Sequence, residues 1–543
     1  MSGGIFGTLH PFYEGGCVNG RKVANAGFMD ALLAVDPFAE YHFFVGNPQA
    51  LQGFLAEREH LPAVRRKAVL TLPRTELPAR LAATDYAVFH FSDPIDDFVK
   101  LASLRNACAR TLFPITCLTH SINYQSYAAA FLAHIWPGCS PRDALGCNSH
   151  AARAVIEQYF THLRAAYSLP DSIPAPRLAV QHLGVAAARL RERSACQQAR
   201  HAMRQRLGVP ATSCLVLLFG RISLADKLDI QPLLLALRRL RERQELDVHL
   251  VVGGFQEPND NACDFLRHVA QLLGLALHLA PNPDEADKAA LFAAADIFAS
   301  PSDNIQETFG LSLLEAGAAA LPVVAADWDG YRDIIVDGET GILAPTLAPA
   351  ATPELDAAAP GLFDNQLQYL RSQQTAISVP AMAQAIARLA ADPALRERMG
   401  NAAQERVRAH FTWEGAIARW CAFWEELRAV PLDGPTEQRL RQTRHPLALP
   451  QGEIFAAYAS AHPTPDTVLA ATALGADVRS RRLPLEIAGK LPPQVSEERA
   501  RQALTLARRP LALATLAPRL AGSPEEGLAL LLWLLKHDLL EIQ

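Results

Sequence analysis

Short apolar runs alternate with longer amphipathic segments over the first third of the chain. The apolar runs have the length and composition of buried strands, and the segments between them have the periodicity of helices. The predicted strands are Gly4–His10, Tyr41–Val45, Tyr86–Phe91, Thr111–Thr119, Ala144–Asn148 and Leu178–His182, and the predicted helices are 21–35, 49–58, 96–109 and 149–167. Alternation of this kind is typical of a parallel, doubly wound sheet covered by helices.

The same alternation begins again after a basic, helical connector at Arg189–Leu207. We interpret the arginines of this connector as a solvated helix face. The second series of predicted strands is Leu215–Gly220, Val248–Gly253, Leu275–Leu279, Asp296–Ala299, Pro322–Ala326 and Gly341–Leu343. Two doubly wound halves in one chain imply a cleft between them, and ligands are expected at the carboxyl ends of the strands.

The pattern changes after the second series of strands. Residues 344–375 are rich in Ala and Pro, and we expect an insertion loop with a short helix there. Helices are predicted next at 380–392, 394–409 and 413–428. The Pro- and Arg-rich stretch 431–450 then predicts a linker.

The last segment, 451–543, is predicted to be a small, mainly helical accessory module. Ser523-Pro-Glu-Glu526 forms a capping box in front of the apolar run Leu528–Leu535. The order of elements over 510–543 resembles a winged helix, which raises the alternative of DNA binding. The helix that would enter the groove begins with Glu525 and Glu526, which repel phosphate, so docking against protein is the favoured use.

Composition is ordinary for a soluble globular protein, and the length predicts two or three domains. The chain has 543 residues, of which 50% are hydrophobic and 20% charged, and a net charge of −5 gives no general case for nucleic-acid binding. The nine cysteines form no C-x-x-C pair, which favours free thiols in a reducing compartment. The sequence shows neither a signal peptide nor an apolar run of the ~18 residues needed to span a bilayer. We therefore expect a cytoplasmic protein, with peripheral membrane contact left open and the oligomeric state undetermined.

The most informative feature is a pair of glutamates separated by seven residues, Glu307 and Glu315. Glu307 lies in the loop between a predicted strand and a predicted helix, and Glu315 lies on that helix. The free amides at the start of a helix attract anions or hydroxyl oxygens, and a nearby carboxylate can accept the hydroxyl protons that amides cannot. Together these groups suit a phosphorylated ligand with many hydroxyls.

The stretch from Glu307 to Glu315 resembles the E-x7-E signature of the retaining family 4 glycosyltransferases. Two further matches lie in the family's order: Gly220-Arg221 with Lys227 after a predicted strand, and Asp337-Gly338 before the last predicted strand. The resemblance covers roughly residues 205 to 425 well and the first half more weakly. It implies the GT-B fold, in which two Rossmann-like doubly wound domains face a cleft.

With the resemblance, the predicted organisation is a first, acceptor domain at 1–188 and a second, nucleotide-sugar donor domain at 189–412. A helix at 413–430 is expected to cross back to the first domain. The linker at 431–450 and the winged-helix-like module at 451–543 then complete the chain.

The resemblance also implies roles for residues of the second domain. Arg221 and Lys227 would bind the donor diphosphate, Glu307 would bind hydroxyls of the donor sugar, and Glu315 would bind the ribose. The backbone amides that would face the sugar or phosphate are those of Phe309, Gly310 and Leu311. A cation near the diphosphate is chemically reasonable, because breaking the anomeric bond places charge on the leaving group.

Fewer residues are implicated in the first domain. Gly15 and Gly16 follow the first predicted strand, where small residues let the backbone approach the donor phosphates or the acceptor, although a plain turn is an equal alternative. His120 ends the fourth predicted strand and resembles the family's active-site histidine. Ser149 and Arg153 follow the fifth and are weaker candidates.

No metal or other cofactor is expected. Asp327-Trp328-Asp329 fits the D-x-D pattern of a different glycosyltransferase fold, but such triplets are frequent, and the resembled family does not use this loop for metal. Gly184-Val185-Ala186 departs from the family pattern because its third residue is usually acidic, so the contacts at this hinge are in question.

The predicted function is metal-independent retaining transfer of a hexose-type sugar from a nucleotide-diphosphate sugar to a glycan, lipid-linked or protein acceptor, as in cell-surface glycan or glycoconjugate synthesis. The leaving phosphate is the expected base, since no carboxylate of the first domain stands out as a nucleophile. The alternatives are a sugar-nucleotide epimerase or a phosphorylase on the same fold, and a non-catalytic regulator that binds nucleotide sugars. The donor base, the sugar and the acceptor are not specified by the sequence.

Overall fold

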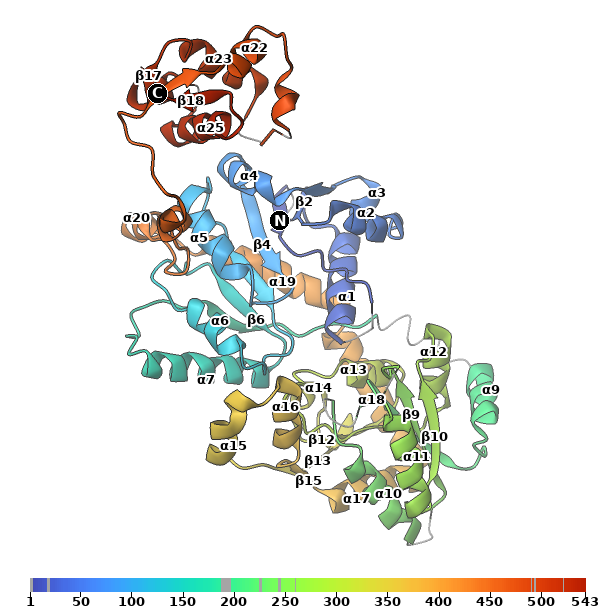
Figure 1. Cartoon of the computed structure of the whole chain (residues 1–543). Coiled ribbons are helices and arrows are strands. Elements are labelled where there is room, and N and C mark those ends of the chain that lie inside the picture. The colour runs from blue at the N-terminus through green and yellow to red at the C-terminus, as the bar shows by residue number, and fades with distance from the viewer. Residues whose placement is uncertain are drawn as a thin grey trace. The chain divides into compact units, whose positions relative to one another are not determined.

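The computed structural model describes residues 3–16, 20–186, 197–223, 227–242, 246–258, 260–489, 491–492, 495–520 and 522–543. The chain divides into two compact units, Met1–Ala448 and Leu449–Gln543. Unit 1 contains two Rossmann-like lobes, and unit 2 is a small module with its own sheet (Figure 1).

The first lobe is built on a seven-stranded parallel sheet in the order β3-β2-β1-β4-β5-β6-β7. Its strands are β1 Ile5–Thr8, β2 Glu40–Phe44, β3 Val69–Leu72, β4 Tyr86–Phe91, β5 Ile115–Leu118, β6 Ala144–Cys147 and β7 Arg177–Val180. Its helices are α1 Gly20–Val35, α2 Pro48–Ala56, α3 Pro62–Arg65, α4 Leu77–Ala83, α5 Phe98–Cys108, α6 Tyr127–Ala133 and α7 His150–Ala166. The central strands β4, β5 and β6 are buried along their whole length, which is why they are continuous apolar runs in the sequence.

The second lobe has a six-stranded parallel sheet in the order β10-β9-β8-β11-β12-β13. Its strands are β8 Cys214–Phe219, β9 Val248–Gly254, β10 Ala276–Pro281, β11 Ile297–Ser300, β12 Val323–Ala326 and β13 Gly341–Ala344. Its helices include α9 Gln197–Leu207, α10 Gln231–Glu242, α11 Ala262–Leu273, α12 Glu285–Ala294, α13 Leu311–Ala318, α14 Tyr331–Ile334, α17 Val379–Ala391 and α18 Pro393–His410. The predicted fold class is confirmed: both sheets reverse their strand order at one point, β1/β4 and β8/β11, where such sheets bind ligands.

Helix α19, Trp413–Ala429, returns from the second lobe to the first and packs against α1 (Figure 1). The indole of Trp424 donates a hydrogen bond to Thr116 Oγ1 on β5 at 3.0 Å. Trp420 is fully buried and lies where a side chain on Gly146 of β6 would otherwise point. The first lobe is therefore completed by a segment that follows the second lobe in sequence.

Two segments contain more structure than the sequence pattern predicts. The insertion at 344–375 has two helices, α15 Pro353–Ala358 and α16 Asp364–Ser372. Its ends are joined by an antiparallel pair, β14 Thr346–Leu347 and β15 Ala376–Ile377. The prediction of a loop with a single short helix was wrong because these helices are mostly exposed, so they lack the apolar face that reveals a core helix.

The interval 431–450, predicted as a linker, contains helix α20, Gly434–Gln442, which is capped by Asp433 and packs against α5. Leu440 on this helix is fully buried, and His445 Nε2 lies 2.9 Å from the carbonyl of Ala133. Arg441 donates to the carbonyl of Ala109. Most of the interval therefore belongs to unit 1.

Unit 2 contains a small antiparallel sheet in which β16, Val468–Ala471, lies between β17, Leu511–Ala512, and β18, Leu540–Ile542. Its helices are α21 Gln451–Ile454, α22 Ala473–Arg479, α23 Glu497–Leu506, α24 Leu513–Leu516 and α25 Pro524–Lys536. Ser523 caps α25 by accepting a hydrogen bond from the amide of Glu526 at 3.2 Å. Within the described parts of the chain, no helix combines the length and the apolarity needed to cross a membrane.

Candidate functional site

Glu307 lies in the loop between β11 and α13, at the carboxyl edge of the second sheet. Its carboxylate accepts a hydrogen bond from Lys227 Nζ at 2.6 Å and from the amides of Thr308 and Phe309 at 3.3 Å. Burial alone raises the pKa of Glu307, but the ammonium of Lys227 and the two amides outweigh it and hold the pKa below its ordinary value. Glu307 is therefore ionised and fixed in place.

Gly310 makes the sharp turn from this loop into α13. It precedes the helix with a φ of 113°, in the left-handed region that favours glycine. A Cβ on Gly310 would lie 2.6 Å from the ring of Tyr331. Glycine at this position lets the loop bring Glu307 and the first amides of α13, including that of Leu311, to the same edge of the sheet.

Arg221 and Lys227 both come from the loop that follows β8, the strand beside β11. Arg221 Nη2 donates to Gln306 Oε1 at 2.7 Å, next to the Lys227–Glu307 pair. The structure thus brings Arg221 and Lys227 next to the loop of Gln306 and Glu307, although the two paired contacts span 85 and 80 residues of sequence. Gln306 was not predicted, because a polar residue in a loop carries no spacing signal.

Glu315 lies on α13, where its carboxylate accepts a hydrogen bond from Lys288 Nζ on α12 at 2.6 Å. Both side chains are mostly buried, with 15% and 18% of their surface exposed. The ammonium of Lys288 also lies 5.4 Å from the ring centre of Phe219, at the end of β8. Lys288 was missed by sequence reasoning, since the contact joins two different helices and follows no local motif.

His120 follows β5 at the carboxyl edge of the first sheet. It is 7% exposed, and its Nε2 lies 2.8 Å from Asn25 Oδ1 on α1. Burial lowers the pKa of His120 to about 4, so the imidazole is neutral near pH 7. A neutral imidazole can exchange hydrogen bonds with hydroxyl groups without adding charge.

The loops of the two lobes meet beside Glu307. Ser121, next to His120, donates to the carbonyl of Gln306 at 3.5 Å, and Asn148 Nδ2 donates to Thr308 Oγ1 at 2.9 Å. His120 and Glu307 therefore lie on neighbouring loops of opposite lobes.

Gly15 and Gly16 lie in the loop after β1, and residues 17–19 are outside the described part of the chain. Gly16 has a φ of 87°, and the carbonyl of Gly15 accepts a hydrogen bond from Lys22 Nζ at 2.7 Å. The positive φ explains the glycine at position 16 as a turn requirement. A donor-binding role for the pair stays a prediction.

The D-x-D triplet does not present two free carboxylates. Asp327 accepts a hydrogen bond from Arg332 Nε at 2.6 Å. Asp329 Oδ2 is buried and has no hydrogen-bond partner among the described residues. Burial and then the charge of Glu307 raise the pKa of Asp329 well above its ordinary value.

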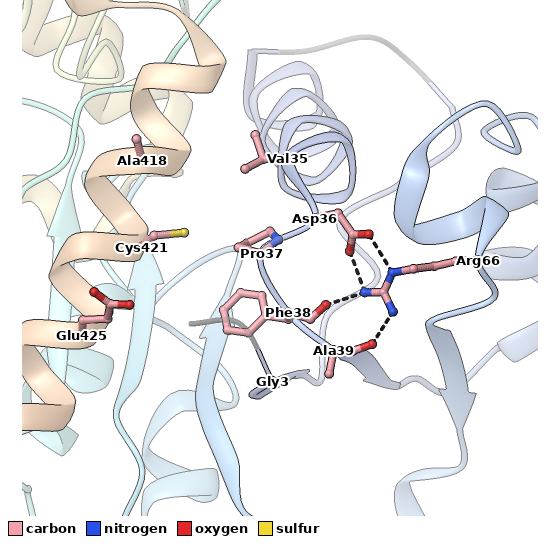
Figure 2. A pocket seen from close by; sticks show the side chains of 10 residues that line it. All are labelled: Gly3, Val35, Asp36, Pro37, Phe38, Ala39, Arg66, Ala418, Cys421 and Glu425. Carbon is pink, nitrogen blue, oxygen red and sulfur yellow. Dashed lines mark hydrogen bonds and ion pairs between the residues drawn. The ribbon is translucent and has the colours of Figure 1, made fainter.

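A pocket of about 520 Å³ lies elsewhere, at the amino ends of β1, β2 and β3 and against α19 (Figure 2). Arg66 is the cation of this pocket, but its guanidinium is engaged by both carboxylate oxygens of Asp36 and by the carbonyls of Phe38 and Ala39. The loops that carry ligands in such sheets are at the opposite, carboxyl edge. This pocket is not the candidate site.

The two sheets, their strand order and the meeting of their carboxyl edges define the GT-B class of fold. Solved structures support this: a glycosyltransferase from Rickettsia africae is 14% identical with a TM-score of 0.55 and covers 79% of this chain and 100% of its own. Anabaena Alr3699/HepE, solved with UDP and glucose, is 17% identical with a TM-score of 0.52 and covers 78% of this chain and 100% of its own. Residues 199–353 match the family model described as Glycosyl transferases group 1, in agreement with the resemblance to the family 4 enzymes.

Sequence relatives agree with that family. A D-inositol 3-phosphate glycosyltransferase from Streptomyces avermitilis is 31% identical over 247 residues, 45% of this chain and 45% of the relative. A phosphatidyl-myo-inositol mannosyltransferase from Mycobacterium tuberculosis is 36% identical over 152 residues, 28% of this chain and 37% of the relative. The chain thus spans less than half the length of these relatives in each match.

Proposed function

We propose that this chain is a retaining glycosyltransferase that takes a sugar from a nucleotide-diphosphate sugar and transfers it without a metal ion or other cofactor. The observation that carries the proposal is the cluster of Arg221, Lys227 and Glu307 with the amides of Thr308 and Phe309 in the loop before α13, at the carboxyl edge of the second sheet. Cations and oriented amides beside an ionised carboxylate provide the groups that a diphosphate and a sugar need.

Each proposed role follows from the hydrogen bond or ion pair that the side chain now makes to protein and could make to the donor instead. Lys227 and Arg221 would turn from their protein partners toward the donor diphosphate and stabilise the charge that develops as the anomeric bond breaks. Once Lys227 turns to the diphosphate, Glu307 would accept hydrogen bonds from hydroxyl groups of the sugar. The amides of Phe309, Gly310 and Leu311 would donate hydrogen bonds to sugar or phosphate oxygens. Glu315 would accept hydrogen bonds from the ribose hydroxyls, and Lys288 would hold its carboxylate in position.

His120 is the proposed contribution of the first lobe. It is neutral and lies on the loop that reaches Gln306, so it can hydrogen-bond a sugar hydroxyl or a phosphate oxygen. The leaving phosphate would take the acceptor proton in a retaining transfer. The donor's anomeric configuration would then be kept in the product.

The acceptor is proposed from the relatives as a polyol or a lipid that carries one. The names of the two relatives both contain inositol, as a phosphate or within a phospholipid. An acceptor panel should therefore include inositol 3-phosphate and phosphatidylinositol beside simple glycans. The donor panel should begin with UDP-glucose, because the Anabaena neighbour was solved with UDP and glucose.

The test is a thermal-shift screen over nucleotide sugars followed by a transfer assay with the best donor, because a ligand that binds only the folded state raises its melting temperature. Transfer should persist in excess EDTA, and proton NMR should show the donor's anomeric configuration in the product. Inhibition by EDTA that added metal reverses would contradict the metal-independent mechanism. Epimerised donor without transfer would instead assign an epimerase.

Lys227→Met is the sharpest single variant for this proposal. It removes the ammonium but keeps a flexible chain of similar length, and we expect donor affinity to fall by about 1.5–3 kcal/mol, the range for a hydrogen bond to a charged group. Lys100→Met is the matched control, because Lys100 is 74% exposed and lies on α5. Equal behaviour of the two variants would place the diphosphate elsewhere.

A further inference from the structure

Two histidines and one aspartate from both lobes of unit 1 converge on the far side of Phe309 from Glu307, and the proposed transfer reaction assigns none of them a role. His150 begins α7 and His182 follows β7 in the first lobe, while Asp333 lies on α14 in the second. His150 Nδ1 and His182 Nε2 each lie 2.9 Å from the same oxygen, Asp333 Oδ2. The three atoms all lie within 4.8 Å of one another.

We propose that His150, His182 and Asp333 form a binding site for a divalent transition metal, Zn²⁺ being the best match, which bridges the two lobes. Two imidazole nitrogens and one carboxylate oxygen are a ligand set that zinc commonly takes, with water in the remaining position. Mg²⁺ and Ca²⁺ prefer more oxygen ligands than this cluster supplies. The site is built from this chain's own side chains and does not depend on the proposed transfer reaction.

The ligands are held in position by other contacts. The ring of His182 stacks on Phe309 with centres 5.9 Å apart and meets Phe411 edge-on at 5.4 Å. Arg406 Nη2 donates to the carbonyl of Asp333 at 2.7 Å, and the Asp333 side chain is only 8% exposed. Two of the three ligands thus have a fixed orientation, which lowers the entropy cost of binding a metal ion.

The third ligand leaves the site accessible. The side chain of His150 is 70% exposed, so a metal ion can enter from solvent and keep a water ligand. Asp333 Oδ2 also accepts a hydrogen bond from the backbone amide of His150 at 2.9 Å, which keeps it beside both imidazoles. On binding, each imidazole carries its proton on the other ring nitrogen and exchanges its hydrogen bond to Asp333 for a bond to the metal. Since the three side chains come from both lobes, a bound ion would favour the arrangement in which the lobes meet at this point.

A metal ion at this site would also act on the loop that carries Glu307. His182 stacks on Phe309, which donates its amide to Glu307. A bound ion would therefore stabilise the position of this loop. It would also resist separation of the lobes, so added Zn²⁺ should slow turnover if lobe opening limits product release.

The experiment uses the full-length chain, stripped with EDTA and then freed of chelator. Zn²⁺ binding is followed by isothermal titration, and Co²⁺ is used as a visible-absorption probe of coordination geometry. We expect one ion per chain and a Co²⁺ spectrum of four-coordinate type. His182→Asn and His150→Asn should each weaken binding by about tenfold or more, on the scale that altered metal surroundings produce.

His162→Asn is the matched control, because His162 is exposed on α7, the same helix as His150. It should bind Zn²⁺ as the unchanged chain does. If His182→Asn fails to fold, His150→Asn still tests the site, since its exposed side chain is removed without disturbing the core. Absence of Zn²⁺ binding, or binding that survives both substitutions, would overturn the proposal and leave a hydrogen-bonded His–Asp–His group.

Discussion

At the residue scale, the structure brings together several residues that the local motifs singled out, but the motifs gave no sign of the protein groups that these residues contact. Arg221, Lys227 and Glu307 were expected to converge, because each follows a strand of one parallel sheet and such strands end at the same edge. Gln306 and Lys288 were not expected. Their contacts depend on how a loop and a helix pack in three dimensions, and no spacing in the sequence encodes that.

Glu307→Gln should lower turnover while leaving nucleoside-diphosphate binding nearly unchanged. The amide keeps the size of the side chain but loses the charge that Lys227 and the sugar hydroxyls use, and we expect a loss of roughly 100-fold or more in kcat, as for other groups that stabilise developing charge. Turnover and titration with UDP are measured on the same preparation. Glu339→Gln, in an exposed turn, is the control, and loss of UDP binding in Glu307→Gln would mean the roles are misassigned.

Glu315→Gln should act mainly on nucleotide affinity, whereas Glu307→Gln acts on turnover. Losing the ionised acceptor should weaken nucleotide affinity by about 1–3 kcal/mol, the usual range for a charge-assisted hydrogen bond. Lys288→Met should also weaken nucleotide affinity, because the Lys288 ammonium positions the Glu315 carboxylate through a hydrogen bond of 2.6 Å. Titration with UDP tests both variants, and unchanged affinity in Glu315→Gln would remove the ribose assignment.

At the element scale, prediction succeeded where strands are buried on both faces. Strands β4, β5 and β6 read as continuous apolar runs, and their positions were close to those expected. Strand β3 was missed, because Val69–Leu72 is partly exposed and lacks that signal. Helix α20 was also missed. The sequence around it is rich in Pro and Arg, and only one residue of the helix, Leu440, is buried.

Helix α20 sets where the chain can be cut. A chain that ends after Ala448 should keep the melting temperature of unit 1, whereas one that ends after Asp433 should melt earlier, because it loses Leu440 and His445 and uncovers the surface of α5. Leu440→Ala in the full chain isolates one part of this loss and should cost about 2–5 kcal/mol, as for other buried leucines. Thermal unfolding compares the three. Equal melting of both truncated chains would show that α20 is dispensable.

At the scale of the whole molecule, sequence predicted two lobes that face a cleft but not the contacts that join them. Asn148 reaches Thr308 and Gln125 reaches the carbonyl of Leu362, across 160 and 237 residues of chain. Such contacts form only once two independently built sheets dock, so they leave no periodicity in the sequence. The His150–His182–Asp333 cluster belongs to the same class and was likewise not predicted.

Buried histidines should make the folded chain sensitive to acid. Burial lowers the pKa of His134 to about 4, and its Nδ1 is buried without a hydrogen-bond partner among the described residues. Burial also lowers the pKa of His120 to about 4, and it lowers the pKa of fully buried His90 well below its ordinary value. The unfolded chain, with histidine near 6.5, binds more protons than the folded chain between these pH values, so stability is complete above about pH 6.5 and falls as pH drops toward 4.

His134→Gln should reduce this sensitivity. A pKa lowered from 6.5 to about 4 corresponds to roughly 3 kcal/mol of stability that is present at pH 7 and lost on acidification. Glutamine can still donate to the carbonyl of Pro94, which lies 2.8 Å from His134 Nε2, but it does not titrate. Thermal unfolding near pH 7.5 and near pH 5 should show a smaller drop in melting temperature for His134→Gln than for the unchanged chain.

The control is His162→Gln, at an exposed histidine, which should show the full drop. Other titrating groups, such as Asp303 with its pKa raised to about 7 by burial, are the same in all three chains, so their effects cancel in the comparison. An identical drop in all three would mean that His134 is protonated in the folded chain despite its burial.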